Sequence, residues 1–328
     1  MPGIDAFIAG LPKAELHLHL EGTLEPALRD ALAKRNGITL PRVPPFHDLT
    51  SFLVGYYQSM QVLRTEADFY DLAIAYFRKA RSQNVVYAEV FFDPQAHTSR
   101  GVPFSAVIEG FDRARADAAA ELGLRAQLIM CFLRDMPADS AHQALEQSLP
   151  YKDKIIGVGL DSDERDNPPL KFKEVFRRAS AEGYRLTMHC DVDQADAVAH
   201  IWQCLDDIGV ERIDHGVNCL EDPSLVARLA VDQIGLTVCP VSNAWVTASM
   251  KAPELKAMLD KALLATVNSD DPAYFEAYVN ENLAAVTSEG SLTREDVTRL
   301  IRHSFEIAWL DPRERAAYQA QVDQYARL

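Results

Sequence analysis

The chain has 328 residues, of which 48% are hydrophobic, and its 33 basic and 48 acidic residues give a net charge of −15. This length suits one α/β barrel, the hydrophobic share suffices for a large core, and the negative charge argues against a nucleic-acid partner. No run approaches the 18 apolar residues of a membrane span, and five cysteines without framework spacing favour free thiols in a reducing, cytoplasmic compartment.

Short β-rich runs alternate with longer amphipathic stretches along most of the chain. Eight runs are predicted as strands: residues 14–19, 85–92, 125–133, 154–160, 184–189, 211–215, 234–239 and 264–269. Five of the stretches between them are predicted as helices: residues 66–83, 104–122, 171–182, 195–208 and 222–232. The alternation and the count of eight predict a parallel (β/α)8 TIM barrel, built as one domain over residues 1–328.

Two segments lie outside this repeat. Residues 36–65 are rich in proline and aromatic residues and interrupt the connection between the first two strands. They are long enough to carry extra helices and to lie over the barrel mouth as a lid. Residues 273–328 are predicted to form helices that pack on the outside of the barrel.

Residues with chemical side chains gather where the predicted strands end. In a barrel the carboxyl ends of all strands meet at one face, which carries the active site. Seven of the eight runs end in such residues: His17 and His19, Asp93, Asp161 and Ser162, His189, Asp214 and His215, Ser242 and Asn243, and Asn268 to Asp271. One such coincidence is weak support, but seven together predict a site at this face.

The first run contains a His-x-His pair, and alternate side chains of a strand share one face. His17 and His19 would therefore lie about 7 Å apart and could converge on one metal ion. Together with His189 and Asp270 they offer three nitrogens and one oxygen, a set suited to one Zn²⁺. Binding to the metal lowers the pKa of a water molecule towards about 7, so that hydroxide forms at neutral pH.

Two further residues fit this chemistry. His215 could accept a proton from the water or orient it, and Asp271, which follows a predicted ligand, could bind a substrate N–H. Taken singly, His189 or His215 could equally be a buried structural histidine, and the two aspartates before Pro272 could cap a helix. The joint pattern favours a metal site.

The chain resembles the adenosine/adenine deaminase branch of the amidohydrolase superfamily over almost its whole length. The resemblance rests on six stretches: LPKAELHLHLEGTLEP at 11–26, FFDPQAHTSRG at 91–101, GLDS at 159–162, ERIDHGV at 211–217, LTVCPVSN at 236–243 and VNSDDPAYF at 267–275. It implies a barrel with a single zinc held by His17, His19, His189 and Asp270. It also implies that His215 handles the attacking water, that Asp271 binds the substrate, and that the reaction is hydrolytic deamination at C6 of a 6-aminopurine.

Two details favour a free base over a nucleoside. Glu21 stands where adenosine deaminases usually carry an aspartate that reaches the ribose. The fourth strand is followed by Asp-Ser-Asp-Glu, as in adenine deaminases, so that Ser162 and Glu164 become candidate substrate contacts. Glu164 could bind the N–H at the position that ribose would occupy, although it could also be an ordinary solvated loop acid.

The chain departs from the family at one important place. The family's fifth-strand motif is His-Ala-Gly-Glu, and its glutamate protonates a ring nitrogen, whereas here Val192 takes the glutamate's place. We expect Asp193, or alternatively Asp191, to supply the proton. Otherwise the substrate differs, for instance an N6-substituted adenine or another aminated heterocycle, or the chain is a purine-binding relative without activity. A small purine-type molecule is the expected partner, and formation of a homo-oligomer is left open.

Overall fold

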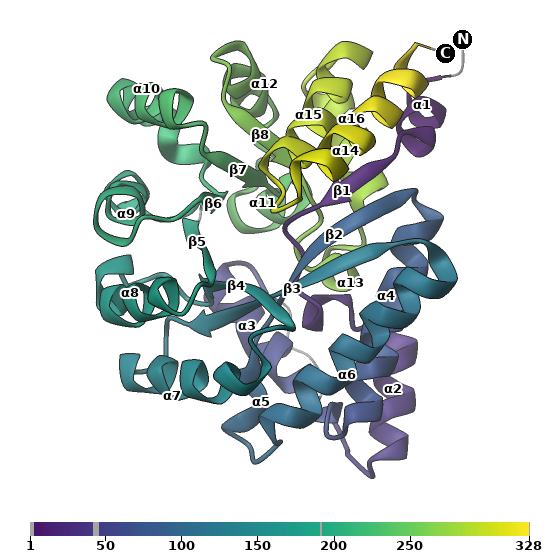
Figure 1. Ribbon diagram of the computed structural model, residues 1–328, viewed down its shortest axis with the longest axis vertical. Coiled ribbons are helices and arrows are strands. Elements are labelled where there is room, and N and C mark those ends of the chain that lie inside the picture. Colours follow the sequence, from purple (N-terminus) through teal and green to yellow (C-terminus); the bar gives the residue numbers. More distant parts are fainter. Residues whose placement is uncertain (1–2, 42–45, 191, 328) are drawn as a thin grey trace.

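The computed structural model describes residues 3–41, 46–190 and 192–327, and these residues form a parallel β-barrel surrounded by helices (Figure 1). Each strand pairs in parallel with the next, in the order β1 to β8. The strands are β1 (Lys13–Glu15), β2 (Val85–Phe92), β3 (Arg125–Leu133), β4 (Ile155–Asp161), β5 (Arg185–Cys190), β6 (Arg212–His215), β7 (Gly235–Val238) and β8 (Leu264–Val267). The predicted (β/α)8 architecture is confirmed.

The barrel closes between β8 and the segment after β1. The Asp270 amide donates to the His17 carbonyl at 3.0 Å, and the His19 amide donates to the Asp270 carbonyl at 3.0 Å. These two bonds join the ends of the sheet through backbone groups of predicted metal ligands. The closure of the barrel therefore fixes these ligands relative to one another.

Helices follow the strands and cover the outer face of the barrel (Figure 1). In the first half these are α1 (Ile4–Gly10), α2 (Pro26–Arg35), α3 (Leu49–Ser59), α4 (Glu66–Ser82), α5 (Pro94–Thr98), α6 (Phe104–Asp117), α7 (Ala138–Ser148) and α8 (Lys173–Ala181). In the second half these are α9 (Ala197–Gln203), α10 (Pro223–Asp232), α11 (Pro240–Thr247), α12 (Ala252–Asp260), α13 (Pro272–Phe275), α14 (Val279–Glu289), α15 (Arg294–Ile307) and α16 (Pro312–Ala326). The predicted helices 104–122 and 195–208 both end in a π-helical turn, at Ala118–Leu122 and Cys204–Ile208.

The first strand is shorter than predicted. Regular pairing ends at Glu15, and the next backbone amide, that of Leu16, donates to the side-chain oxygen of Asn268 at 2.9 Å. Leu18 and His19 then form isolated bridges to Asp270 and Phe91. His17 and His19 thus lie on extended chain just past the strand, where a side-chain amide replaces one bond of the sheet.

The predicted lid segment contributes helix α3 and a short 3₁₀ turn, Met60–Val62. The aromatic side chains of α3 pack against α13, with the rings of Phe52 and Phe275 5.2 Å apart. Two hydrogen bonds join α3 to the loop after β4: Tyr57 with Ser162 at 2.8 Å and Thr50 to Asp163 at 2.6 Å. The segment therefore spans the barrel mouth from β8 to β4, as a lid would.

The C-terminal helices pack outside the barrel as predicted. The ring of Tyr325 on α16 lies 5.9 Å from that of Phe7 on α1, so the two ends of the described chain are close together (Figure 1). No helix among the described residues is long and apolar enough to cross a bilayer.

A buried ion pair ties β2 to β6 inside the barrel. Arg212 is fully buried and donates to Glu89 at 2.6 Å, and its Nε lies 3.6 Å from Asp214. Glu89 also accepts from Tyr87 and from the backbone amide of Trp309. Removing the guanidinium would leave two carboxylates buried without their cation.

We expect Arg212→Met to lower the free energy of unfolding by about 3–5 kcal/mol, because the loss of one partner leaves buried charge uncompensated. Urea denaturation followed by circular dichroism measures this. Arg177→Met is the matched control, since Arg177 pairs with Glu174 on the surface and both side chains are more than half exposed. Its effect should stay below about 1 kcal/mol. Equal effects of the two substitutions would contradict the assignment of a stabilising network to Arg212.

Candidate metal centre and substrate cavity

Three imidazoles and one carboxylate converge at the carboxyl end of the barrel. The Nε2 atom of His189 lies 3.1 Å from that of His17 and 3.2 Å from that of His19. Asp270 Oδ1 lies 3.5 Å from the Nε2 atoms of His17 and His19. Ligands 2.0–2.1 Å from a tetrahedral zinc are separated by roughly 3.3 Å, so these four atoms fit one such ion.

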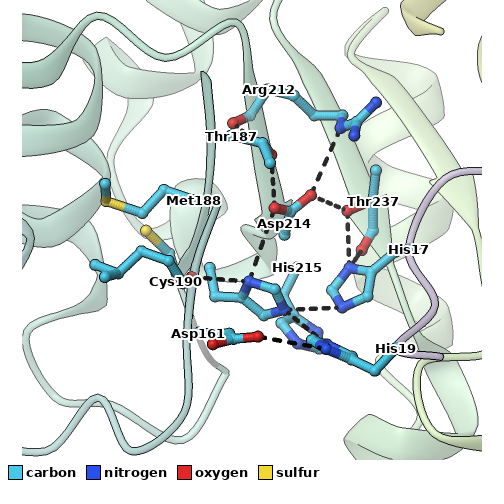
Figure 2. A network of polar contacts seen from close by, with 12 residues as sticks. His17, His19, Asp161, Thr187, Met188, Cys190, Arg212, Asp214, His215 and Thr237 are labelled. Carbon is cyan, nitrogen blue, oxygen red and sulfur yellow. Dashed lines mark hydrogen bonds and ion pairs between the residues drawn. The ribbon is translucent and has the colours of Figure 1, made fainter. Parts of the chain in front are cut away.

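The far sides of two of the imidazoles, those of His17 and His189, are held by acceptors, as in many metal sites. His17 Nδ1 lies 2.9 Å from Thr237 Oγ1, and His189 Nδ1 donates to the Leu160 carbonyl at 3.0 Å. Thr237 donates its own proton to Asp214 at 2.8 Å, so its oxygen accepts from His17 (Figure 2). These contacts place the protons on Nδ1 and leave the Nε2 lone pairs free for a metal.

The third imidazole, that of His19, faces a carboxylate at a longer distance. Its Nδ1 lies 3.4 Å from Asp161 Oδ2 at the end of β4 (Figure 2). The ring of Phe91 lies under all three histidines, with centroid distances of 5.2 Å to His17, 5.0 Å to His19 and 5.3 Å to His189. This apolar floor keeps water from reaching the imidazoles from below.

Three residues with a strained backbone lie at the same face. Ser162, His215 and Asp270 have φ angles of 75°, 61° and 62°, a left-handed conformation that costs non-glycine residues about 1–3 kcal/mol each. They lie at the ends of β4 and β6 and just after β8. Such strain clusters at functional sites, and here all three side chains line one cavity.

His215 and Asp271 lie beside the four candidate ligands. His215 ends β6, and its Nε2 is 3.8 Å from Asp270 Oδ2. Asp271 is nearly buried, and its Oδ1 accepts no hydrogen bond from any described residue. Gly22 packs so closely against this carboxylate that a Cβ there would lie 1.9 Å from Oδ1, which explains the glycine in the first motif.

Five of these six residues border a cavity of about 730 Å³, including its open mouth, while His17 lies buried behind it. Its outer wall is aromatic and aliphatic, formed by Phe46 and by residues of α3, α11 and α13: Leu49, Phe52, Leu53, Tyr56, Tyr57, Trp245, Val246 and Phe275. Trp245 is 48% exposed at the rim. A cavity of this size and character typically holds an organic ligand that is oriented by a few polar groups.

The segment after β5 contributes two residues to the cavity. Val192, at the place of the family glutamate, is nearly buried and lines it, as does the half-buried Asp193. Burial raises the pKa of Asp193, while its hydrogen bond from Gln194 lowers it. Asp191, the alternative proton donor, lies outside the described residues.

The predicted substrate contacts differ in position. Ser162 lines the cavity, but Glu164 and Glu21 do not. Glu164 is fully buried, 3.3 Å from Arg134 and hydrogen-bonded to His200, so it is neither the predicted substrate contact nor a solvated acid. Glu21 is also fully buried and accepts from His97 at 2.8 Å and from the Asp93 amide at 3.2 Å. Both carboxylates support the cavity wall from behind.

Three cavity residues had no role assigned from the sequence, although each ends a predicted strand. Asp93, Asp161 and Asn243 are buried and line the cavity. Burial raises the pKa of Asp161 to about 7, and burial together with the charge of Asp161 raises the pKa of Asp93 well above its usual range. Both amide atoms of Asn243 lack a hydrogen-bond partner among the described residues.

Comparison with known proteins identifies the family. A family model described as adenosine deaminase matches residues 12–325. The chain belongs to the adenosine deaminase family. Members of this family are hydrolytic deaminases of the amidohydrolase superfamily and use a divalent metal, which agrees with the converging ligands.

Individual relatives are similar over their whole length. An uncharacterized deaminase of Schizosaccharomyces pombe is 50% identical over 335 aligned positions, which cover 99% of each chain. The crystal structure of adenine deaminase from Arthrobacter aurescens has a TM-score of 0.93 at 41% identity, covering 97% of this chain and 100% of that one. An amidohydrolase of Burkholderia ambifaria, solved with bound Zn, has a TM-score of 0.89 at 27% identity, covering 98% and 93%.

Proposed function

We propose that this member of the adenosine deaminase family hydrolyses adenine or a closely related 6-aminopurine base, releasing ammonia, with one zinc per chain in a reducing cytoplasm. The observation that carries the proposal is the convergence of His17, His19, His189 and Asp270 beside His215 and Asp271, all of which except His17 line one cavity. The likeness to the adenine deaminase from Arthrobacter aurescens supports the choice of a free base.

Zinc is favoured over other divalent metals because three imidazoles and one carboxylate form a donor set that suits it. The similar amidohydrolase with bound Zn supports this choice. When bound, the ion would supply a Lewis acid and a water that ionises near neutral pH.

The residues around the ligands have separate tasks in this proposal. His215 orients the attacking water and takes its proton. Asp271 binds the purine N7 edge through its unpartnered oxygen. Asp193 gives a proton to ring nitrogen N1, the role of the family glutamate that Val192 replaces here. The lid residues on α3 cover the ring and exclude bulk water.

A second candidate substrate is an adenine with an apolar substituent on N6. Phe46, Phe52, Trp245 and Phe275 form an apolar wall of the cavity, and Val192 adds an apolar surface at the altered motif. An alkyl group buried there would add favourable transfer free energy of about 0.8 kcal/mol per methylene. The same chemistry would then release an alkylamine.

The test is a panel of adenine, N6-methyladenine, larger N6-alkyl adenines and adenosine, with the release of ammonia or amine as the measurement and bound metal determined in parallel. We expect stoichiometric divalent metal and turnover of a free base, with adenosine a poor substrate. Higher kcat/KM for the N6-alkyl bases would favour the second candidate.

Two outcomes would contradict the proposal. Binding of purines without any turnover across the panel would support an inactive purine-binding relative instead. Turnover that is unaffected by complete removal of metal would contradict the assignment of the ligands.

A further inference from the structure

A pair of buried carboxyl groups lines the cavity opposite the residues that handle water. Asp93 and Asp161 are 2% and 3% exposed, and one oxygen of each lies within 4.8 Å of a ring nitrogen of His19 and of the other. No N–H group of the described residues donates a hydrogen bond to Asp93 Oδ1 or to either oxygen of Asp161. Unpartnered buried oxygens are costly unless a ligand satisfies them.

The order of the strands fixes where this pair lies. Asp93 follows β2 and Asp161 ends β4, whereas His215 ends β6 and Asp270 follows β8. In an eight-stranded barrel with the order β1 to β8, strands β2 and β4 lie across the barrel from β6 and β8. The carboxyl pair and His215 therefore face each other across the candidate metal site.

The proposed function orients the substrate between these two sides. With N7 at Asp271 after β8 and N1 at Asp193 after β5, one face of the purine is directed towards β6 and β7. The other face is directed towards β1 to β4, where Asp93 and Asp161 lie. A water oriented by His215 adds to C6 from the first face, so the amino group of the tetrahedral carbon is pushed towards the second.

We propose that Asp93 and Asp161 form the leaving-amine site, where their oxygens accept N–H hydrogen bonds from the amino nitrogen as its bond to C6 breaks. This inference rests on the proposed function. The water oxygen bonds to C6, one water proton ends on N1 and the other on the leaving nitrogen, and breakage of the C6–N bond gives a 6-oxopurine and ammonia. Oxygen acceptors aimed at that nitrogen stabilise the positive charge that develops on it.

Of the two residues, Asp93 is the better one to vary. Asp161 also contacts His19 at 3.4 Å, so its substitution would disturb a candidate ligand. The Asp93 side chain makes no helix-capping hydrogen bond to α5, although the residue stands at the N-terminus of that helix. Asp93→Asn keeps the shape of the side chain and replaces one of its two oxygens by an amide group that donates hydrogen bonds.

The experiment compares two leaving groups that depart after the same attack at C6. Asp93→Asn is assayed with the best amine substrate of the panel and with 6-chloropurine, whose chloride carries no N–H. We expect kcat/KM for the amine substrate to fall about 10- to 100-fold, the usual worth of a charge-assisted hydrogen bond. Because carboxylates do not favour a departing chloride, the ratio of the two kcat/KM values should fall by at least about tenfold.

Asp193→Asn is the matched control, since loss of the N1 proton donor should slow both substrates and leave their ratio unchanged. Bound metal and the thermal unfolding midpoint show whether each variant is folded. The native enzyme provides an independent measurement: at constant ionic strength, ammonium should inhibit hydrolysis of 6-chloropurine more strongly than tetramethylammonium.

Several results would overturn the inference. These are an unchanged ratio in Asp93→Asn, equal inhibition by the two cations, or two metal ions per native chain, which would make the pair ligands of a second ion. Failure of the proposed function is distinguishable, because the native protein would then hydrolyse neither the amine substrate nor 6-chloropurine.

Discussion

Replacing His17 by alanine is expected to release the bound metal and to lower kcat/KM by roughly four orders of magnitude or more. Without the ion, water in the cavity regains its ordinary, much higher pKa, and too little hydroxide forms at neutral pH to attack the purine. His17 is held on both sides, since its Nε2 faces His189 at 3.1 Å and its Nδ1 is held by Thr237.

The measurement is the metal content of the purified variant, followed by turnover with and without added zinc. His142→Ala is a suitable control because His142 lies on α7 and does not line the cavity. That variant should keep both metal and activity. If His17→Ala retained one metal per chain and near-native kcat, the metal would be bound elsewhere and the ligand set would be wrong.

Most of the barrel could be predicted because buried parallel strands have a strong local signal. Strands β2 and β3 have the predicted bounds, and the other strands after β1 differ by one or two residues at an end. These runs are apolar and β-branched, flanked by polar or glycine residues, so that local pattern and tertiary environment agree. The sequence overestimates the length of the first strand because the alternating pattern continues through His19. Regular pairing ends at Glu15, since the amide of the next residue, Leu16, donates to the side chain of Asn268.

The position of the metal site could be predicted for a topological reason. The carboxyl ends of all barrel strands meet at one face, so residues as distant as His17 and Asp270 must be neighbours once the fold is known. The chemistry of the individual loops could not be derived in the same way. Glu164 is four residues from Leu160, a distance that gives no information on whether it enters the cavity or, as observed, turns back to Arg134 and His200.

The pairing of Asp93 with Asp161 could not be predicted from the sequence either. Each residue was noted at a strand end, but β2 and β4 are not adjacent in the sheet, and the sequence does not indicate that their carboxyl groups share a wall. Only the side-chain positions show that their oxygens lack hydrogen-bond donors. The roles of polar residues therefore depend on a few ångströms of loop geometry, which periodicity does not encode.

The second large expected effect is a loss of kcat on substitution of Asp193, in the loop after β5 where Val192 replaces the family glutamate. Asp193→Asn should lower kcat by about 10²–10⁴-fold, the usual contribution of a general acid, because an amide cannot protonate N1. Bound metal should be unchanged, since Asp193 is not needed as a ligand. The structure supports Asp193 because it lines the cavity beside Val192, and because burial raises its pKa and so favours the protonated acid that the reaction needs.

The pH profile provides a sharper test than the rate alone. The acid must be protonated, so native kcat should fall as pH rises through its pKa, and this limb should disappear in Asp193→Asn. Asp191→Asn is the paired variant, because Asp191 is the other acid of the loop and lies outside the described residues. If Asp191→Asn alone removed the limb, the donor would be Asp191. If both variants kept near-normal turnover, the proton would reach N1 from another group, and the loop would have lost the family glutamate without replacing it.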